Sequence, residues 1–388
     1  MDFRFTAEHE ALRGEVRTFL KDALTSEFAT TRPTSQDNWD GQLAFLKRLA
    51  ERKWVAPAWP EAYGGLGWRH VNQMIFSEEL SYAGAPDAGR VFSTGMIGPT
   101  LIVHGTEQQR REHLARITSG ESIWCQGYSE PGAGSDLASL QTRAARDGDE
   151  YVINGQKIWT TGAHHADWCF MVVRTDPDAP KHRGISFLLV DMKTPGITVR
   201  PIVNMAGHHE FNEVFFEDVK VPVANRVGEE NNGWYVAMTL LDFERSNVAS
   251  IAANQRVLEE LGGYLRGQAA TLAPRDILRH RLADLWIAND IGRLLSYRIA
   301  WMQESGRLVN VEASVIKVFA TELAQRIANA GVNLQGATGG LVPGSPRAAL
   351  GGMLADDHLS NVSPTIYSGS SEIQRNIIAT RGLGLPRD

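Results

Sequence analysis

Hydrophobic residues recur at helical spacing through the first third of the chain. The spacing of three and four residues places them on one face of a helix. Proline and glycine residues interrupt the pattern between residues 57 and 67. The predicted helices cover residues 8–20, 39–54, 72–82 and a stretch after Pro99.

The pattern changes at about residue 121, where short β-branched and aromatic runs begin. They predict strands at residues 151–153, 158–161, 169–173, 185–190 and 213–216. Asn154-Gly155 is typical of a tight hairpin, because both of its turn positions favour a positive φ. Helical periodicity returns from residue 233 to the end, and we predict one long helix there from about Trp234 to Leu265. The sequence therefore predicts an α+β multidomain protein, with helical residues 1–120, β residues 121–230 and a helical bundle at 231–388.

Length and composition exclude several classes of protein. With 388 residues, the chain is longer than one hydrophobic core usually supports. A net charge of -6 gives no attraction for nucleic acid or anionic lipid. Cys125 and Cys169 are far apart in sequence, which argues against a disulfide framework and a zinc site. No targeting peptide and no membrane span is evident, so we expect a cytoplasmic protein.

A carboxylate interrupts an apolar stripe in the predicted helix after residue 234. Leu240, Leu241, Val248 and Ile251 share a face with Glu244. Burying a carboxylate raises its pKa, and a catalytic base needs such a shift. From this helix alone, a structural ion pair with Arg245 or with a neighbouring helix is the favoured explanation.

Glycine and hydroxyl residues gather in Trp124 to Asp136, where a predicted strand runs into a turn. Such a turn exposes backbone N–H groups to a ligand that approaches closely. It is not a dinucleotide fingerprint, because Leu137 holds the third glycine position and no βαβ unit follows. Trp159 to Gly162 adds an aromatic plane and two hydroxyls, although most tryptophans in strands belong to the core.

A third stretch, Ile366 to Ile377, contains a glycine turn followed by a helix that Ser370 caps. Its first-turn N–H groups could hold a polar ligand, or it is simply a capped C-terminal helix. Two adjacent histidine pairs, 164–165 and 208–209, give metal catalysis little support. Consecutive strand side chains point to opposite faces, so neither pair readily forms one site.

The three stretches, in this order, resemble the acyl-CoA dehydrogenase family over nearly the whole chain. Residues 211–222 and 333–340 add to the resemblance. It implies a middle β-barrel or sandwich domain, a C-terminal four-helix bundle, and FAD bound between these two domains. It also implies an oxidoreductase that converts an acyl-CoA to the trans-2-enoyl-CoA and passes electrons to electron transfer flavoprotein.

The resemblance places the cofactor and the substrate on particular residues. The positions implied for FAD are Gln126, Tyr128, Ser129, Trp159, Thr161, Arg275, Gly336, Ser370 and Glu372. Those implied for the acyl-CoA are Ser135, Asp242, Arg245 and Ser368. No metal is implied.

The catalytic base departs from the commonest pattern of the family. Many members carry a glutamate in a Tyr-Glu-Gly-Thr motif, but Ser368 stands at that position here. A subset resembling isovaleryl-CoA dehydrogenase carries it on the bundle helix in a Leu-Asp-x-Glu-Arg pattern, which residues 241–245 match. Glu244 is then the base that takes the α-proton, while hydride goes to flavin N5. The backbone N–H of residue 368 can still polarise the thioester carbonyl.

A second departure concerns assembly. In homotetrameric relatives an Arg-x-x-Phe-Gly segment with a later Gln reaches the FAD of a neighbouring subunit. Arg275 matches it, but Leu278, Arg279 and Trp286 replace the other residues. The chain looks like bacterial members that degrade steroid side chains or other bulky acyl-CoAs, some of them α2β2 heterotetramers. Both a homotetramer and a heterotetramer with a related chain stay open.

Two other functions also remain open. An acyl-CoA oxidase shares the first half-reaction, but such chains are usually longer. A structural subunit that has lost the chemistry would fit Ser368, whereas Glu244 opposes it.

Overall fold

A computed structural model describes residues 4–24, 38–239, 246–268 and 275–386. By contacts the chain forms two compact units, each of which is described by itself. Unit 1 consists of residues 1–25, 69–85 and 245–388, and unit 2 of residues 26–68 and 86–244. No helix within the described ranges is long and apolar enough to cross a membrane.

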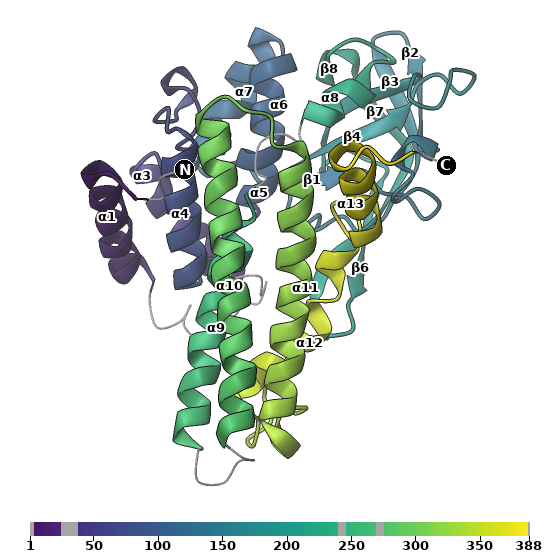
Figure 1. Cartoon of the computed structure of the whole chain (residues 1–388). Coiled ribbons are helices and arrows are strands. Elements are labelled where there is room, and N and C mark those ends of the chain that lie inside the picture. The colour runs from purple at the N-terminus through teal and green to yellow at the C-terminus, as the bar shows by residue number, and fades with distance from the viewer. Residues whose placement is uncertain (1–3, 25–37, 240–245, 269–274, 387–388) are drawn as a thin grey trace. The chain divides into compact units, whose positions relative to one another are not determined.

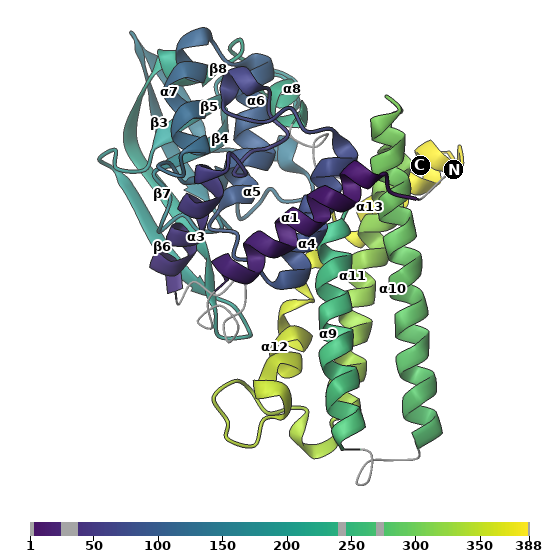
Figure 2. The same cartoon turned by 90° about the vertical axis from the view of Figure 1, so that its left-hand side faces the viewer.

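Unit 1 is built from long helices (Figures 1 and 2). They are α1 (Ala7–Ala23), α4 (His70–Ala83), α9 (Val248–Gly267), α10 (Arg275–Glu304), α11 (Asn310–Leu334), α12 (Met353–Ser360) and α13 (Ser371–Ile377). Helices α9, α10 and α11 lie side by side, and α4 packs against α9 and α10. Apolar side chains that recur at helical spacing along α11, such as Ile316, Leu323 and Ile327, fill the space between the three helices.

A buried cluster of charges joins α1, α4 and α10 within unit 1. The Arg13 guanidinium forms ion pairs with Glu78, at 2.8 Å, and with Glu79. The hydroxyl of Tyr297 donates a 2.6 Å hydrogen bond to the second carboxylate oxygen of Glu78. Burial and the nearby Glu78 carboxylate raise the pKa of Tyr297. The phenol therefore remains a hydrogen-bond donor at neutral pH.

Unit 2 combines short helices with a sheet. Its helices are α3 (Trp39–Glu51), α5 (Arg90–Phe92), the π-helical η3 (Ser93–Ile97), α6 (Gly98–His104), α7 (Glu107–Thr118) and α8 (Gly233–Thr239). Its strands are β1 (Trp124–Gly127), β2 (Arg143–Asp147), β3 (Glu150–Lys157), β4 (Trp168–Arg174), β5 (Ile185–Asp191), β6 (Ile197–Val203), β7 (His209–Pro222) and β8 (Arg226–Val227). The strand order is β6-β7-β3-β2-β4-β5-β8, and β1 pairs with β4 in parallel.

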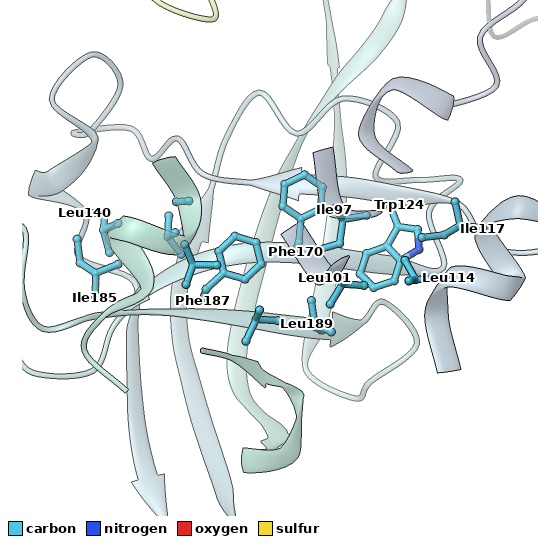
Figure 3. Close-up of a cluster of buried hydrophobic side chains, with 14 of the residues drawn as sticks. Ile97, Leu101, Leu114, Ile117, Trp124, Leu140, Phe170, Ile185, Phe187 and Leu189 are labelled. Atoms are coloured by element: carbon cyan, nitrogen blue, oxygen red, sulfur yellow. The ribbon is translucent and has the colours of Figure 1, made fainter. Parts of the chain in front are cut away.

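The central strands β4 and β5 are buried on both faces. Phe170 and Phe187 stack with centroids 6.0 Å apart in a cluster that extends to Trp124 (Figure 3). The intervening residues, such as Met171 and Leu188, enter a second cluster on the opposite face. This explains why these strands are continuous apolar runs instead of alternating ones.

The two cysteines of the chain lie side by side in this sheet. Cys125 of β1 and Cys169 of β4 are in register on paired parallel strands. Both thiols are free and buried. Their separation in sequence therefore does not keep them apart in the fold.

The predicted fold class of helical, β and helical parts is confirmed, but the hairpin at Asn154-Gly155 is wrong. Strand β3 runs through both residues and pairs with β7, with an irregularity between Ile153 and Gly155. Asn154 instead bonds to Asp218 of β7, and Gly155 allows the close approach of Thr142. The hairpin turn in this region instead joins β2 to β3, at residues 148–149, before the predicted position.

The long helix predicted from Trp234 to Leu265 is also interrupted. Helix α8 is described as far as Thr239, and α9 begins at Val248, after the non-helical residues 246 and 247. Asn247 adopts a left-handed conformation with φ of 52°, which an α-helix cannot accommodate. Val248 and Ile251 of the predicted apolar stripe are buried, whereas residues 240–245 lie outside the described ranges.

Candidate active site

The glycine-rich stretch forms strand β1 and the loop that follows it, as predicted. Gly127 is required by packing, because a Cβ there would come within 2.9 Å of the Cys169 sulfur. The Tyr128 ring packs edge-on against Phe170, at a centroid distance of 5.9 Å, and burial raises the pKa of its phenol. The ring therefore packs against the core, while the residue as a whole remains partly exposed.

A buried ion pair fixes this loop. The Lys157 ammonium, wholly buried, lies 2.7 Å from a carboxylate oxygen of Glu130 and donates to the Tyr128 carbonyl at 3.1 Å. The Glu130 carboxylate also accepts bonds from the amides of Gln141, at 2.6 Å, and Thr142, at 2.9 Å. Burial alone would raise the pKa of Glu130, but Lys157 and these donors hold it below its usual value. The carboxylate is therefore ionised at neutral pH.

Trp159 is displayed on the surface of unit 2. Its side chain is 56% exposed, and its backbone is left-handed with φ of 60°. The preceding amide, that of Ile158, donates to the Ser129 carbonyl at 2.9 Å, which ties the tryptophan segment to the glycine-rich loop. Residues 158–161 form no strand, contrary to the prediction, because the left-handed residue turns the chain. Thr161, two residues further on, is partly exposed.

The remaining predicted residues of unit 2 have different surroundings. Gln126 is partly exposed, and its amide nitrogen lies 3.8 Å from the Met96 sulfur on the π-helical turn. Ser135 is exposed, and the next residue, Asp136, pairs with Lys181. Both side chains are thus available to a ligand.

The third predicted stretch lies in unit 1, where Ser368 and Gly369 form a left-handed turn with φ of 53° and 83°. The hydroxyl of Ser370 caps α13 by accepting a bond from the Ile373 amide, as predicted. The pKa of the exposed Glu372 carboxylate is lowered by hydrogen bonds to the backbone of Glu372 itself and to the Ser370 hydroxyl. Glu372 also lines an open cavity of about 460 Å³ between α11 and α13.

A buried lysine holds that turn in place. The Lys317 ammonium of α11 donates to the carbonyls of Gly369, at 2.6 Å, and Pro364, at 2.9 Å. Burial lowers the pKa of Lys317. These bonds fix the backbone on either side of Ser368.

Sequence reasoning missed both buried lysines, although each leaves a signal. Lys157 follows Tyr151 and Ile153 on the inward face of its strand. Lys317 stands in the apolar row of α11 between Ala313 and Ala320. A charge in a buried row indicates a specific partner.

The predicted base and two substrate residues cannot be placed. Glu244, Asp242 and Arg245 lie outside the described residues, as does the side chain of Arg275 at the start of α10. Gly336 follows α11 with φ of 60°, a conformation suited to glycine at a helix end.

His164 of the first adjacent histidine pair lies against His209 of the second. His164 and His209 stack with centroids 4.0 Å apart, and His165 stacks on Trp39 at 4.1 Å. Among the described residues no group of histidine, cysteine and carboxylate side chains has a geometry that could hold a metal ion. The rings pack face to face instead of converging on one point.

Three models of the acyl-CoA dehydrogenase family match the chain almost end to end. The N-terminal domain matches residues 6–121, the middle domain 125–219 and the C-terminal domain 231–383. The chain therefore belongs to the acyl-CoA dehydrogenase family and is an oxidoreductase that acts on acyl-CoA, a flavoprotein by its family.

Similar proteins include members associated with steroids. Acyl-CoA dehydrogenase IpdE1 of Mycobacterium tuberculosis is 38% identical over 98% of both chains, and FadE26 of the same organism is 35% identical over 100% of this chain and 99% of its own. Among solved structures, the Tcur3481-Tcur3483 steroid ACAD has a TM-score of 0.90 at 33% identity, with 100% of both chains covered. The ChsE4-ChsE5 complex of M. tuberculosis has a TM-score of 0.90 at 36% identity, also with 100% of both covered.

Proposed function

We propose that this protein catalyses the FAD-dependent α,β-dehydrogenation of a bulky acyl-CoA, such as a steroid side-chain thioester, to the trans-2-enoyl-CoA. The observation that supports FAD most directly is the exposed indole of Trp159, which follows Ile158, whose amide donates to the Ser129 carbonyl of the glycine-rich loop. An exposed aromatic plane suits a planar heteroaromatic cofactor. When bound, FAD supplies the acceptor for the β-hydride at N5.

The proposed roles of the protein's residues follow from their chemistry. Gln126, Ser129, Trp159 and Thr161 of unit 2 would hold FAD, with the backbone of Tyr128. Arg275, Gly336, Ser370 and Glu372 would hold it from unit 1. Ser135, Asp242, Arg245 and the Ser368 backbone N–H would bind the acyl-CoA, and a hydrogen bond from that N–H to the thioester carbonyl would make the α-proton more acidic.

Glu244 is the proposed base that removes the α-proton. A carboxylate of ordinary pKa, about 4.3, is too weak a base for an unactivated C–H, so the bound acyl chain must exclude water from it. Ser368 cannot replace it, because a hydroxyl is not basic at neutral pH.

We further propose that the assembled enzyme is a tetramer, with a related chain as partner in an α2β2 arrangement or with identical subunits. Two of the similar solved structures, the Tcur3481-Tcur3483 steroid enzyme and the ChsE4-ChsE5 complex, each pair two named components. Leu278 and Trp286, which replace residues of the cross-subunit segment, pack inside unit 1. Electron transfer flavoprotein is the proposed acceptor, and the division at residues 120 and 230 remains a prediction.

Anaerobic titration tests the reaction. Flavin absorbance is followed as a short acyl-CoA or a steroid side-chain acyl-CoA is added to the protein, alone and with a related chain. We expect the bulky thioester to bleach the wild-type flavin, and Glu244→Gln to bind it without bleaching. Glu259→Gln is the matched control, because it neutralises an exposed carboxylate of α9 whose partners are Tyr82 and Gln255.

Two results would contradict the proposal. Equal bleaching by Glu244→Gln would remove the base from residue 244. A folded wild-type protein that holds flavin but bleaches with no thioester, with or without a related chain, would favour a structural subunit. Rapid reoxidation of the bleached flavin by O2 would instead favour an oxidase.

A further inference from the structure

We infer that Asn212 is a positioning residue that holds the segment Trp159–Thr161 in its binding conformation. The inference rests on the proposed function, since it takes this segment to flank the flavin. Asn212 belongs to the stretch 211–222, which the sequence singles out but to which no role has been given. Its side chain is completely buried.

The segment needs an external support because its backbone is strained. Trp159 is left-handed although it carries a bulky side chain, and such a conformation is unfavourable for a residue with a Cβ. It persists only where the neighbouring structure enforces it. The exposed indole receives little of that support from its own packing.

Asn212 supplies the support on the C-terminal side of the tryptophan. The Thr160 amide donates to the Asn212 carbonyl at 3.0 Å, and the Asn212 side-chain nitrogen donates to the Thr160 carbonyl at 3.0 Å. Both polar groups of the Thr160 backbone are therefore bound by one residue. On the N-terminal side, the Ile158 amide is bound by Ser129. The strained residue is thus clamped between two fixed neighbours.

Two histidines contact the Asn212 amide. Its side-chain oxygen accepts from Nε2 of His209 at 2.8 Å, and its nitrogen lies 3.0 Å from Nδ1 of His164. Because the amide nitrogen only donates, Nδ1 of His164 must be an acceptor and its proton must lie on Nε2. Burial lowers the pKa of His164 to about 4, which keeps the ring in this neutral form. Rotating the amide would turn its oxygen towards the Thr160 carbonyl, which can only accept, so this carbonyl fixes the orientation of the amide and the tautomers of both rings follow from it.

The neighbouring residue completes the support. The Phe211 ring meets the Trp159 ring edge-on, with centroids 5.9 Å apart and an interplanar angle of 86°. Residues 211 and 212 therefore determine the direction of the indole and the backbone that carries it. Strand β7 thereby contributes to the proposed flavin site by supporting the segment that flanks it.

Asn212→Asp tests the inference in the full-length flavoprotein, because it keeps the shape and the acceptor but loses the donor to Thr160. Asn225→Asp is the matched control: it loses a 3.1 Å bond to the Leu189 carbonyl in the same unit. Flavin affinity, visible circular dichroism of the flavin and urea stability are measured for each. We expect both variants to lose stability, and Asn212→Asp alone to bind FAD about 10- to 100-fold more weakly with an altered flavin spectrum.

The inference would be overturned if Asn212→Asp bound FAD as tightly as the wild type and with an unchanged flavin spectrum. It would also be overturned if Asn212→Asp and Asn225→Asp lost FAD affinity to the same extent. If Asn212→Asp does not fold, hydrogen exchange in the flavin-free wild type decides. Slow exchange of the Thr160 and Gly162 amides before FAD is added supports a preformed segment, whereas free exchange until FAD binds overturns it. If the wild type binds FAD but dehydrogenates no acyl-CoA, the proposed reaction is contradicted, whereas the inference about Asn212 is not affected.

Discussion

Breaking the buried ion pair between Glu130 and Lys157 should destabilise unit 2 strongly. Removal of one partner from a buried pair typically costs about 3–5 kcal/mol, since the other charge stays uncompensated. Lys157 is wholly buried and the Glu130 side chain is only 8% exposed, so water can stabilise neither charge. We therefore expect Lys157→Met and Glu130→Gln each to lower the free energy of unfolding by about 3–5 kcal/mol.

The double variant should recover part of that loss. With methionine at 157 and glutamine at 130, no charge remains buried, but the Gln141 and Thr142 amides donate to different carboxylate oxygens of Glu130, so the single glutamine oxygen can accept from only one of them. Replacement of a buried pair by neutral groups of similar size is often nearly neutral. Urea unfolding of the flavin-free proteins gives the three differences and their coupling energy. If the double variant loses as much free energy of unfolding as the two single variants together, the buried-charge explanation is refuted.

Three further changes test other parts of the structure. As pH falls, the Glu130 carboxylate should lose its contribution to stability. The pKa of this group is lower in the folded protein than in the unfolded chain. Its contribution is therefore complete above the unfolded-state pKa and is lost as the pH falls through the folded-state pKa. Gly155→Ala should destabilise by about 1–3 kcal/mol or more, because φ is 150° and the new Cβ would lie 2.7 Å from the Thr142 Cα. Tyr297→Phe should cost about 1–3 kcal/mol, because Glu78 loses a buried donor.

Each of these has its own control. Unfolding free energies of the wild type and Glu130→Gln are compared across pH, and parallel curves would contradict the assignment. Gly148→Ala replaces a left-handed turn glycine with open space around it, and should cost less than Gly155→Ala. Tyr82→Phe removes a bond to Glu259 that is exposed, so a loss as large as that of Tyr297→Phe would argue against burial as the cause.

The sequence predicts the order of helical and β parts because hydrophobic periodicity depends on local geometry. It fails at Asn154-Gly155, where a local turn preference competes with pairing to β7, more than 60 residues away. It fails again near Asn247, whose left-handed conformation breaks a pattern that is helical on both sides. In the first place pairing with a distant strand decides the structure, and in the second a single left-handed residue does; periodicity alone carries no signal of either.

The sequence predicts the exposed residues of the candidate site better than the buried residues that hold them in place. The glycine-rich loop, Trp159 and the Ser370 cap are found from motifs. The residues that hold them, Lys157, Lys317 and Asn212, contact segments 29 to 52 residues away. Spacing along the chain cannot reveal such contacts, although a charge or an amide in an apolar row gives a warning. The role of Glu244 remains a prediction from sequence.

The adjacent cysteines give the sheet an internal chemical reporter. The chain contains only two cysteines, and both thiols are 0–1% exposed on neighbouring strands. A thiol reagent can therefore react only when β1 or β4 opens, and the rate of labelling measures how often the centre of the sheet becomes accessible. Because the two sulfurs lie in register, one opening event should expose both, and the native protein should pass from unlabelled to doubly labelled with little singly labelled species in between.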